Sequence, residues 1–149
     1  MNLSLHFPLK DALFSSNAIR LGIPNVPTQE IIDNMVEAAQ QLEVVRVLLG
    51  NHPIYVDSWF RSPVLNAAVR GSKTSSHLDG WAIDFLCPAF GEPIDIVRAI
   101  ADSGIKFDQL IQEGHWTHIS FDPRMRGEVM TAHFDENGNA HYQTGIHVS

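Results

Sequence analysis

The sequence predicts an α+β fold in which a small antiparallel sheet is flanked by helices. Two observations favour this fold class: patterns typical of helices come early in the chain, and pairs of strand patterns come late. A regular alternation of strands and helices, which would predict a parallel sheet, is not visible. The length of 149 residues is that of one domain, and folding at this size buries roughly two thirds of the unfolded chain's surface. We find no repeat and no linker, so we expect a single domain over residues 1–149.

The longest predicted helix lies at residues 28–49. Apolar residues recur there at steps of three and four, which is the period of a helix with one buried face. Thr28 suits the N-cap, and Gly50 follows the last turn, where glycine commonly ends a helix. Two shorter helices are expected, because proline is typical of the first helical position. They run from the N-cap Ser62 and Pro63 to Val69, and over residues 94–102 between Pro93 and Gly104.

Strand patterns occupy the remaining apolar segments. Residues 81–86 read as a strand with Asp84 as the only acid in an otherwise apolar run. The sequence DENGN at residues 135–139 predicts the turn of a hairpin, because Asn-Gly favours the turns that join antiparallel strands. The other expected strands are residues 54–58, 107–111 and 116–121, and the two strands of the hairpin are residues 129–134 and 140–146.

Composition narrows the classes of partner and of metal site. Cys87 is the only cysteine, so an intramolecular disulfide and a cluster of thiolate ligands are excluded, and a metal would need His, Asp or Glu. The net charge of −7 would repel a polyanion, so nucleic acid is not an expected partner. No apolar run approaches the roughly 20 residues of a membrane-spanning helix, so no membrane partner is expected. The first residues lack a signal-peptide pattern, so we expect synthesis in the cytoplasm. We also expect a monomer.

A histidine and an aspartate stand out in the segment SSHLDGWAID at residues 75–84. His77 follows a serine-rich loop, Gly80 permits a turn, and Asp84 lies in the strand that follows. Imidazole and carboxylate are ligands that zinc accepts at about 2.0–2.2 Å, and a catalytic zinc commonly has three protein ligands and an open position for water. His118 is the candidate third ligand, because an unpaired imidazole would be costly to bury among its apolar neighbours.

The pattern S-x-H-x-x-G-x-A-x-D, followed by W-x-H at residues 116–118, resembles the zinc D-Ala-D-Ala carboxypeptidase-type peptidases, which include small bacteriophage endolysins. Two further segments agree. SWFRSPVLN at residues 58–66 is similar to the family's S-G-Y-R-S-P-x-L-N, and FDQLI at residues 107–111 precedes the last motif as it does in the family. The resemblance implies the α+β fold shared with hedgehog-type domains, with zinc held by His77, Asp84 and His118.

The resemblance also implies residues that act on the substrate. Arg61 would contact a carboxylate of the peptide, which a guanidinium can bind through two hydrogen bonds. Its alternative interpretation is a surface arginine beside a helix. Ser75 would either bind the substrate or order the loop that follows it. A zinc-bound water needs a proton acceptor. Glu113 is the first candidate, five residues before the last histidine of the motif, but His115, at three residues, is a rival that the sequence does not exclude.

These residues predict a zinc-dependent metallopeptidase that hydrolyses peptide bonds of bacterial peptidoglycan, as a D-Ala-D-Ala carboxypeptidase or endopeptidase. By analogy with phage members of the family, it would act on the cell wall after release from the cytoplasm, or as part of the virion. Two alternatives stay open. One is a non-catalytic module that binds a peptide or the cell wall, with a structural metal or none. The other is an enzyme of the same fold that acts on a different small peptide or amide.

Overall fold

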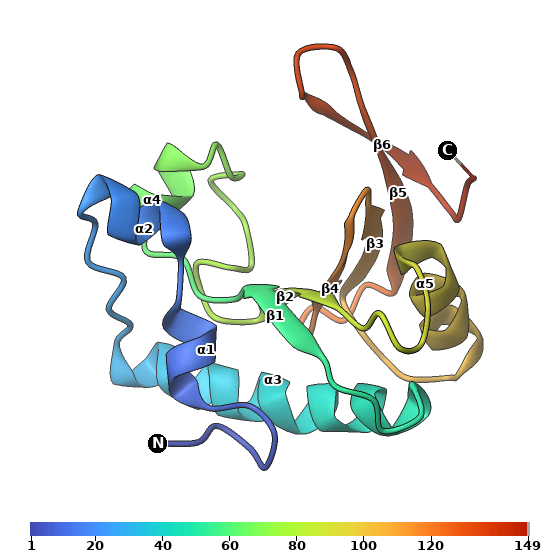
Figure 1. Ribbon diagram of the computed structural model, residues 1–149, viewed down its shortest axis with the longest axis horizontal. Coiled ribbons are helices and arrows are strands. Elements are labelled where there is room, and N and C mark those ends of the chain that lie inside the picture. The colour runs from blue at the N-terminus through green and yellow to red at the C-terminus, as the bar shows by residue number, and fades with distance from the viewer. Residues whose placement is uncertain (149) are drawn as a thin grey trace.

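The computed structural model describes residues 1–148, and it has the α+β architecture that the sequence predicts. A six-stranded sheet packs against helices α3 and α5 (Figure 1). The helices are α1 (Leu9–Leu13), α2 (Ser16–Leu21), α3 (Gln29–Leu48), α4 (Pro63–Ala68) and α5 (Pro93–Asp102). The strands are β1 (Tyr55–Ser58), β2 (Ala82–Leu86), β3 (Gln109–Glu113), β4 (Trp116–Ser120), β5 (Glu128–Phe134) and β6 (Ala140–Thr144).

The longest helix, α3, forms where the sequence predicts it. The side chain of Thr28 accepts a hydrogen bond from the backbone N–H of Ile31 at 3.3 Å, and Gly50 follows the helix with a φ of 83°. Ser62 caps α4 in the same way, through the backbone N–H of Leu65. The buried residues of α3 recur at steps of three and four, and they are Met35, Ala38, Ala39, Leu42 and Val45.

The first two helices, α1 and α2, were not predicted. They have five and six residues, which is too short to show a helical period in the sequence. The segment after α2 contributes Asn25, whose side-chain amide donates to the carbonyl oxygens of Leu13 (3.0 Å) and Phe60 (2.9 Å). The side-chain oxygen Oδ1 of Asn25 accepts a hydrogen bond from the backbone N–H of Ser62. This amide therefore holds the segment that leads into α4 against the N-terminal part of the chain.

The strand order is β1-β2-β4-β3-β5-β6, and neighbouring strands are antiparallel except for β3 and β5. The sheet is thus mostly antiparallel, as the sequence predicts, with one parallel pair. Its cause is the connection after β4. That strand ends beside the start of β3, where Ser120 lies opposite Gln109, and residues 121–127 lead directly to β5. A strand that begins at this end of the sheet runs in the same direction as β3.

The two faces of the sheet differ in chemistry. On one face, Ile83, Phe85 and Ile119 pack with α3 and α5 in the apolar core. Because side chains alternate along a strand, the intervening Asp84 and His118 point to the other face. The sheet thus keeps its acidic and imidazole groups away from the helix-covered core.

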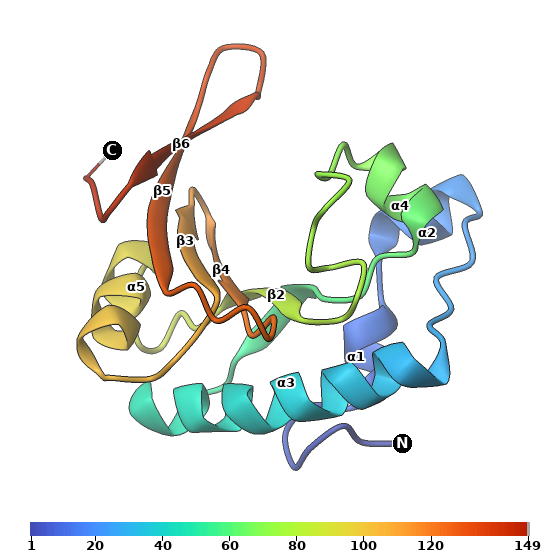
Figure 2. The ribbon, with the colours of Figure 1, turned by 180° about the vertical axis from the view of Figure 1, so that it is seen from behind.

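Chain segments rise above this polar face of the sheet on two sides. In Figure 1 and, from behind, in Figure 2, α4 and the segment that leads to β2 stand on one side, and the β5–β6 hairpin stands on the other. Strands β2 and β4 lie between them. None of the helices within residues 1–148 combines the length and the apolarity needed to cross a bilayer.

Candidate metal centre

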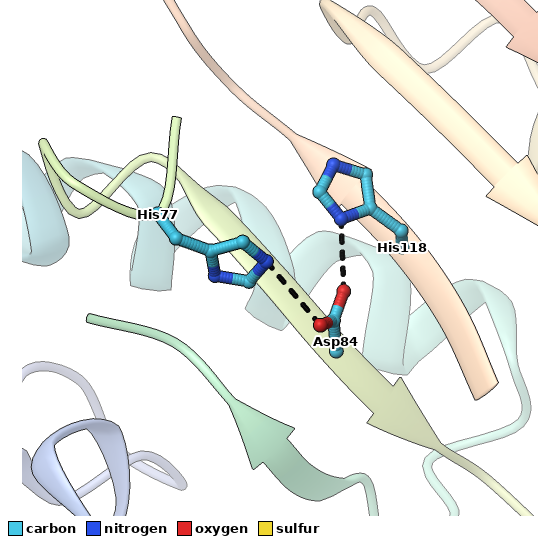
Figure 3. Close-up of side chains that lie close together, drawn as sticks. All are labelled: His77, Asp84 and His118. Carbon is cyan, nitrogen blue, oxygen red and sulfur yellow. Dashed lines mark hydrogen bonds and ion pairs between the residues drawn. The ribbon is translucent and has the colours of Figure 1, made fainter. Parts of the chain in front are cut away.

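Three segments that are far apart in the sequence converge on one point of the polar face (Figure 3). Asp84 of β2 and His118 of β4 lie directly opposite each other in an antiparallel pair, so their side chains point to the same side. His77 comes from the loop before β2. That loop turns at Gly80, which has a φ of 80° and where a Cβ would lie 2.7 Å from the side chain of Met35. Glycine is required here, because it lets the loop pack on α3 and bring His77 to Asp84.

The donor atoms of these three residues lie at distances that suit a metal ion. His77 Nε2 is 3.2 Å from Asp84 Oδ2, and His118 Nδ1 is 2.8 Å from Asp84 Oδ1. One ligand atom from each residue lies within 4.8 Å of the others. Two ligands bound tetrahedrally at about 2.0–2.1 Å lie roughly 3.3 Å apart. All three side chains are buried, and two imidazoles with one carboxylate form a donor set that fits a transition-metal ion.

The backbone fixes the orientation of the His77 ring. Its Nδ1 lies 2.6 Å from the carbonyl oxygen of Trp59, which can only accept a hydrogen bond. Nδ1 therefore carries the proton, and Nε2, which faces Asp84, keeps its lone pair for a metal. The backbone N–H of Arg61 also donates to the carbonyl oxygen of His77 at 3.1 Å. Sequence reasoning missed the Trp59 carbonyl, because a backbone acceptor has no signature in residue type.

Burial and neighbouring charges set the protonation states in the cluster. Burial lowers the pKa of His77, against the opposing effect of Asp84, and keeps this imidazole neutral. Burial would raise the pKa of Asp84, but His77 and His118 outweigh it and hold the pKa of that carboxyl well below its usual value. Burial also disfavours charged His118, yet the hydrogen bond to Asp84 outweighs it and raises the pKa of this imidazole. A metal would therefore meet a neutral imidazole and a carboxylate, and would displace a proton from His118.

Arg61 lies beside the cluster. Its Nη2 is 3.3 Å from Asp84 Oδ2, and its Nε donates to the hydroxyl of Ser58 at 3.2 Å. The side chain is 19% exposed. The interpretation as a surface arginine does not describe this position, whereas contact with a substrate carboxylate stays a prediction.

Ser75 occupies a position that orders the loop of His77. Its hydroxyl oxygen accepts a hydrogen bond from the backbone N–H of His77 at 3.2 Å. The neighbouring Ser76 donates to Asp122 Oδ2, also at 3.2 Å, and so ties the loop to the segment after β4. Sequence reasoning missed this second contact, because its partners are 46 positions apart. Binding of substrate by Ser75 stays a prediction.

The two candidate proton acceptors lie in different environments. Glu113 ends β3 with its Oε1 3.9 Å from His118 Nδ1, and its side chain is 15% exposed. Burial raises the pKa of Glu113, an increase that His118 opposes and Asp84 strengthens. His115 is exposed in the β3–β4 turn, and it lines a cavity of about 100 Å³ with Cys87 and residues of α5, none of which belongs to the cluster. The fold brings Glu113, and not His115, beside the three clustered residues.

Comparison with known protein families agrees with this arrangement. The family model described as Peptidase M15 matches residues 5–120. The match covers more than half of the chain and includes His77, Asp84 and His118, whereas β5 and β6 follow the matched segment. A search of curated proteins found no match. The chain belongs to the peptidase M15 family.

Proposed function

We propose that this protein is a zinc-dependent metallopeptidase that hydrolyses peptide bonds of bacterial peptidoglycan, of the D-Ala-D-Ala carboxypeptidase or endopeptidase type. The observation that carries the proposal is the buried cluster of His77, Asp84 and His118 in a chain of the peptidase M15 family. The resemblance of its motifs to those of endolysins supports a role in phage or prophage lysis. We also propose that the protein acts on the cell wall as a monomer.

The clustered residues would hold the zinc ion through His77 Nε2, the Asp84 carboxylate and His118 Nδ1. Zinc in such a site supplies a Lewis acid that polarises the scissile carbonyl and lowers the pKa of a bound water. Two imidazole donors favour zinc over magnesium or calcium, which prefer oxygen ligands. The Trp59 carbonyl on His77 and the Arg61 guanidinium on Asp84 supply the outer contacts that orient metal ligands.

Glu113 is the proposed proton carrier. A carboxylate that accepts a proton from the attacking water can deliver it to the leaving amine. Its position at the edge of the cluster supports this role, because the proton has to be taken up next to the metal.

Arg61 and Ser75 are the proposed contacts to the peptide. The Arg61 guanidinium reaches Ser58, Asn66 and Asp84 with one contact each, which leaves some of its N–H donors for a carboxylate of the substrate. The Ser75 hydroxyl accepts a hydrogen bond from His77 and keeps its own proton to donate.

The competing hypothesis is a non-catalytic module that binds a peptide or the cell wall around a structural metal. A structural zinc normally has four protein ligands, whereas the cluster found within residues 1–148 has three. Glu113 is the nearest candidate for a fourth ligand. The two hypotheses therefore differ in what loss of Glu113 does: it weakens metal binding if the carboxylate is a ligand, and it spares metal binding if the carboxylate carries protons.

The test is to incubate the zinc-loaded protein with peptidoglycan fragments of defined sequence and to identify the products by mass spectrometry. We expect cleavage of a peptide bond that a chelator stops and added zinc restores. Glu113→Gln should keep its zinc and lose at least about 100-fold in turnover, while His115→Ala should keep both. Inactivity of the wild type on every fragment, together with loss of zinc from Glu113→Gln, would support the binding module. An inactive His115→Ala variant would move the proton-accepting role to His115.

A further inference from the structure

The β5–β6 hairpin borders the face that carries the metal cluster, on the side opposite α4 (Figures 1 and 2). It follows the segment matched by the family model, residues 5–120, and it joins the sheet where β5 pairs with β3. In both views of the ribbon it stands across β2 and β4 from α4 (Figures 1 and 2). A peptide that lies over the cluster across the strands therefore has Arg61, which precedes α4, toward one end and the hairpin toward the other.

The register of the sheet places Tyr142 of β6 in one row with Glu113 of β3. Gln112 lies opposite Thr131 of β5, so the next residues along these two parallel strands, Glu113 and Ala132, are neighbours. Ala132 in turn lies opposite Tyr142. The row across the sheet is therefore Glu113, Ala132, Tyr142.

This row lies on the face of the metal cluster. Ile111, two residues before Glu113, is paired with His118, and His118 is paired with Asp84. Paired residues of neighbouring strands share a face, and so do residues two apart in one strand. The side chain of Tyr142 thus points to the same side of the sheet as Glu113 and the metal cluster.

Only the methyl group of Ala132 lies between Tyr142 and Glu113 in this row. Strands are about 4.8 Å apart, so the backbones of these two residues are separated by about 10 Å, which their long side chains can bridge. Ala132 is 7% exposed, whereas Tyr142 is 53% exposed. The tyrosine therefore has space above the small residue and is accessible to a ligand.

A contact at the neighbouring turn fixes the hairpin relative to Glu113. The ring of Phe134, in β5, lies against Gly114, where a Cβ would be 3.1 Å from the ring. The hydroxyl of Thr131 donates to the carbonyl oxygen of Gly145 at 2.8 Å, which holds the end of the hairpin to β5. The position of Tyr142 is thus tied to the turn that follows Glu113.

The charges of the site reach the Tyr142 hydroxyl. Burial raises the pKa of Tyr142, and the negative charges of Glu113 and Asp84 add to the increase, which Arg61 opposes. The phenol therefore stays protonated in neutral solution, as a hydrogen-bond donor has to be.

We infer that Tyr142 binds the peptide substrate on the side of the scissile bond away from Arg61, with its hydroxyl donating a hydrogen bond to the peptide. The inference rests on the proposed peptidase function and adds a substrate preference to it. Arg61 contacts Asp84 in β2, and four strand spacings, about 19 Å, separate β2 from β6. A peptide extends about 3.4 Å per residue, so a dipeptide spans about 7 Å and a pentapeptide about 17 Å, and the longer peptide is the better match to this separation. The hairpin therefore favours longer peptides.

The test compares Tyr142→Phe with Gln143→Ala, a change at the exposed neighbouring residue of β6, whose side chain points to the other face of the sheet. Values of kcat and KM are measured for a wall pentapeptide and a D-Ala-D-Ala dipeptide, and the Kd of the pentapeptide is measured on the zinc-loaded Glu113→Gln protein. Loss of one hydrogen bond should raise the KM and the Kd of the pentapeptide about fivefold. Tyr142→Phe should leave kcat, the zinc content and the kinetic values for the dipeptide unchanged, and Gln143→Ala should change none of these values.

An unchanged pentapeptide Kd in Tyr142→Phe, or an equal effect on both peptides, would overturn the role of Tyr142 while the peptidase function stands. If the wild type cleaves neither peptide and the Glu113→Gln protein binds neither, the proposed function fails and the inference fails with it.

Discussion

Two buried aspartates of the same sheet region have opposite surroundings. Asp108 is fully buried, and one residue, Arg126, satisfies it with three donors: its backbone N–H (3.0 Å), its Nε (2.8 Å) and its Nη2 (2.9 Å). Asp84 is 3% exposed, and its partners are His77, His118 and Arg61, which come from three different segments.

The difference shows that burial of a charge does not by itself mark a functional site. The partner of Asp108 cannot bind a metal, and the pair closes the loop that carries the chain from β4 to β5. Backbone bonds at the same place, from Gly127 to Phe107 and from Glu128 to Asp108, strengthen that closure. The partners of Asp84 include two imidazoles, which are ligands as readily as hydrogen-bond partners. The chemistry of the partners, rather than the buried carboxylate, distinguishes the candidate metal centre from a structural ion pair.

The largest expected effect separates the two aspartates by activity. Asp84→Asn removes the carboxylate between the two imidazoles, so it should lose bound zinc and at least about 1,000-fold in kcat/KM, because the metal supplies most of the catalysis. Asp108→Asn should keep zinc and stay within about fivefold of wild-type activity at temperatures where it is folded. Zinc content by elemental analysis and peptide hydrolysis are the measurements. Equal loss of zinc in both variants would remove the distinction.

The second expected effect is on the free energy of unfolding, and it comes from loss of the Asp108 carboxylate. Asp108→Asn should lower the free energy of unfolding by about 3 kcal/mol, because it breaks a buried carboxylate–guanidinium pair of which the arginine is partly exposed. Denaturant unfolding measures the change, and exposed Asp102→Asn at the end of α5 is the matched control, expected within about 0.5 kcal/mol of wild type.

The stability difference should also depend on pH. Burial works to raise the pKa of Asp108, but Arg126 outweighs it and lowers the pKa of this carboxyl in the folded protein. Its stabilising contribution is therefore fully present above the unfolded value of about 3.9 and is lost as the pH falls through the lower folded value. The gap between wild type and Asp108→Asn should narrow below about pH 4; a gap that widens on acidification would contradict the ion-pair account.

Zinc should stabilise only proteins that keep Asp84. A ligand that binds the folded state alone adds about 2.7 kcal/mol at 100 times its Kd. Wild type and Asp108→Asn should both show a higher Tm with zinc than with a chelator, whereas Asp84→Asn should show no shift. A zinc-dependent shift in Asp84→Asn would place the metal elsewhere.

The smallest effect tests the loop that presents His77. Ser75→Ala removes the acceptor of the His77 backbone N–H, so it should cost about 1 kcal/mol of stability and a few-fold in activity, with zinc retained. Thr74→Ala, at an exposed neighbour, is the control. A loss of activity in Ser75→Ala beyond 100-fold would indicate a direct part in the reaction.

Local signals in the sequence predicted much of the fold. Thr28 and Ser62 were predicted as caps and act as caps, and Asn137-Gly138 lies in the turn of the predicted hairpin. The three clustered residues were also predicted, because their types and spacing carry the chemistry. The parallel pairing of β3 with β5 and the closure of Asp108 by Arg126 were not, since both depend on how a loop crosses the end of the sheet.

The choice between Glu113 and His115 shows the same limit within the site. The predicted strand ends at residue 111, so the sequence places both residues in a turn around Gly114, where strand alternation gives no direction; in the structure β3 extends through Glu113. Only the fold distinguishes them, because it places Glu113 beside His118 and His115 on the exposed turn. Tyr142 had no signal at all, because its relation to Glu113 comes from strand pairing across β5.

A crystal structure of the zinc-loaded protein, with anomalous scattering measured at the zinc absorption edge, tests the central claim most directly. One zinc peak bounded by His77 Nε2, the Asp84 carboxylate and His118 Nδ1, with a water as the remaining ligand, is the predicted result. A peak at another place, or a zinc closed by Glu113 as a fourth protein ligand, would contradict a catalytic metal centre at this cluster.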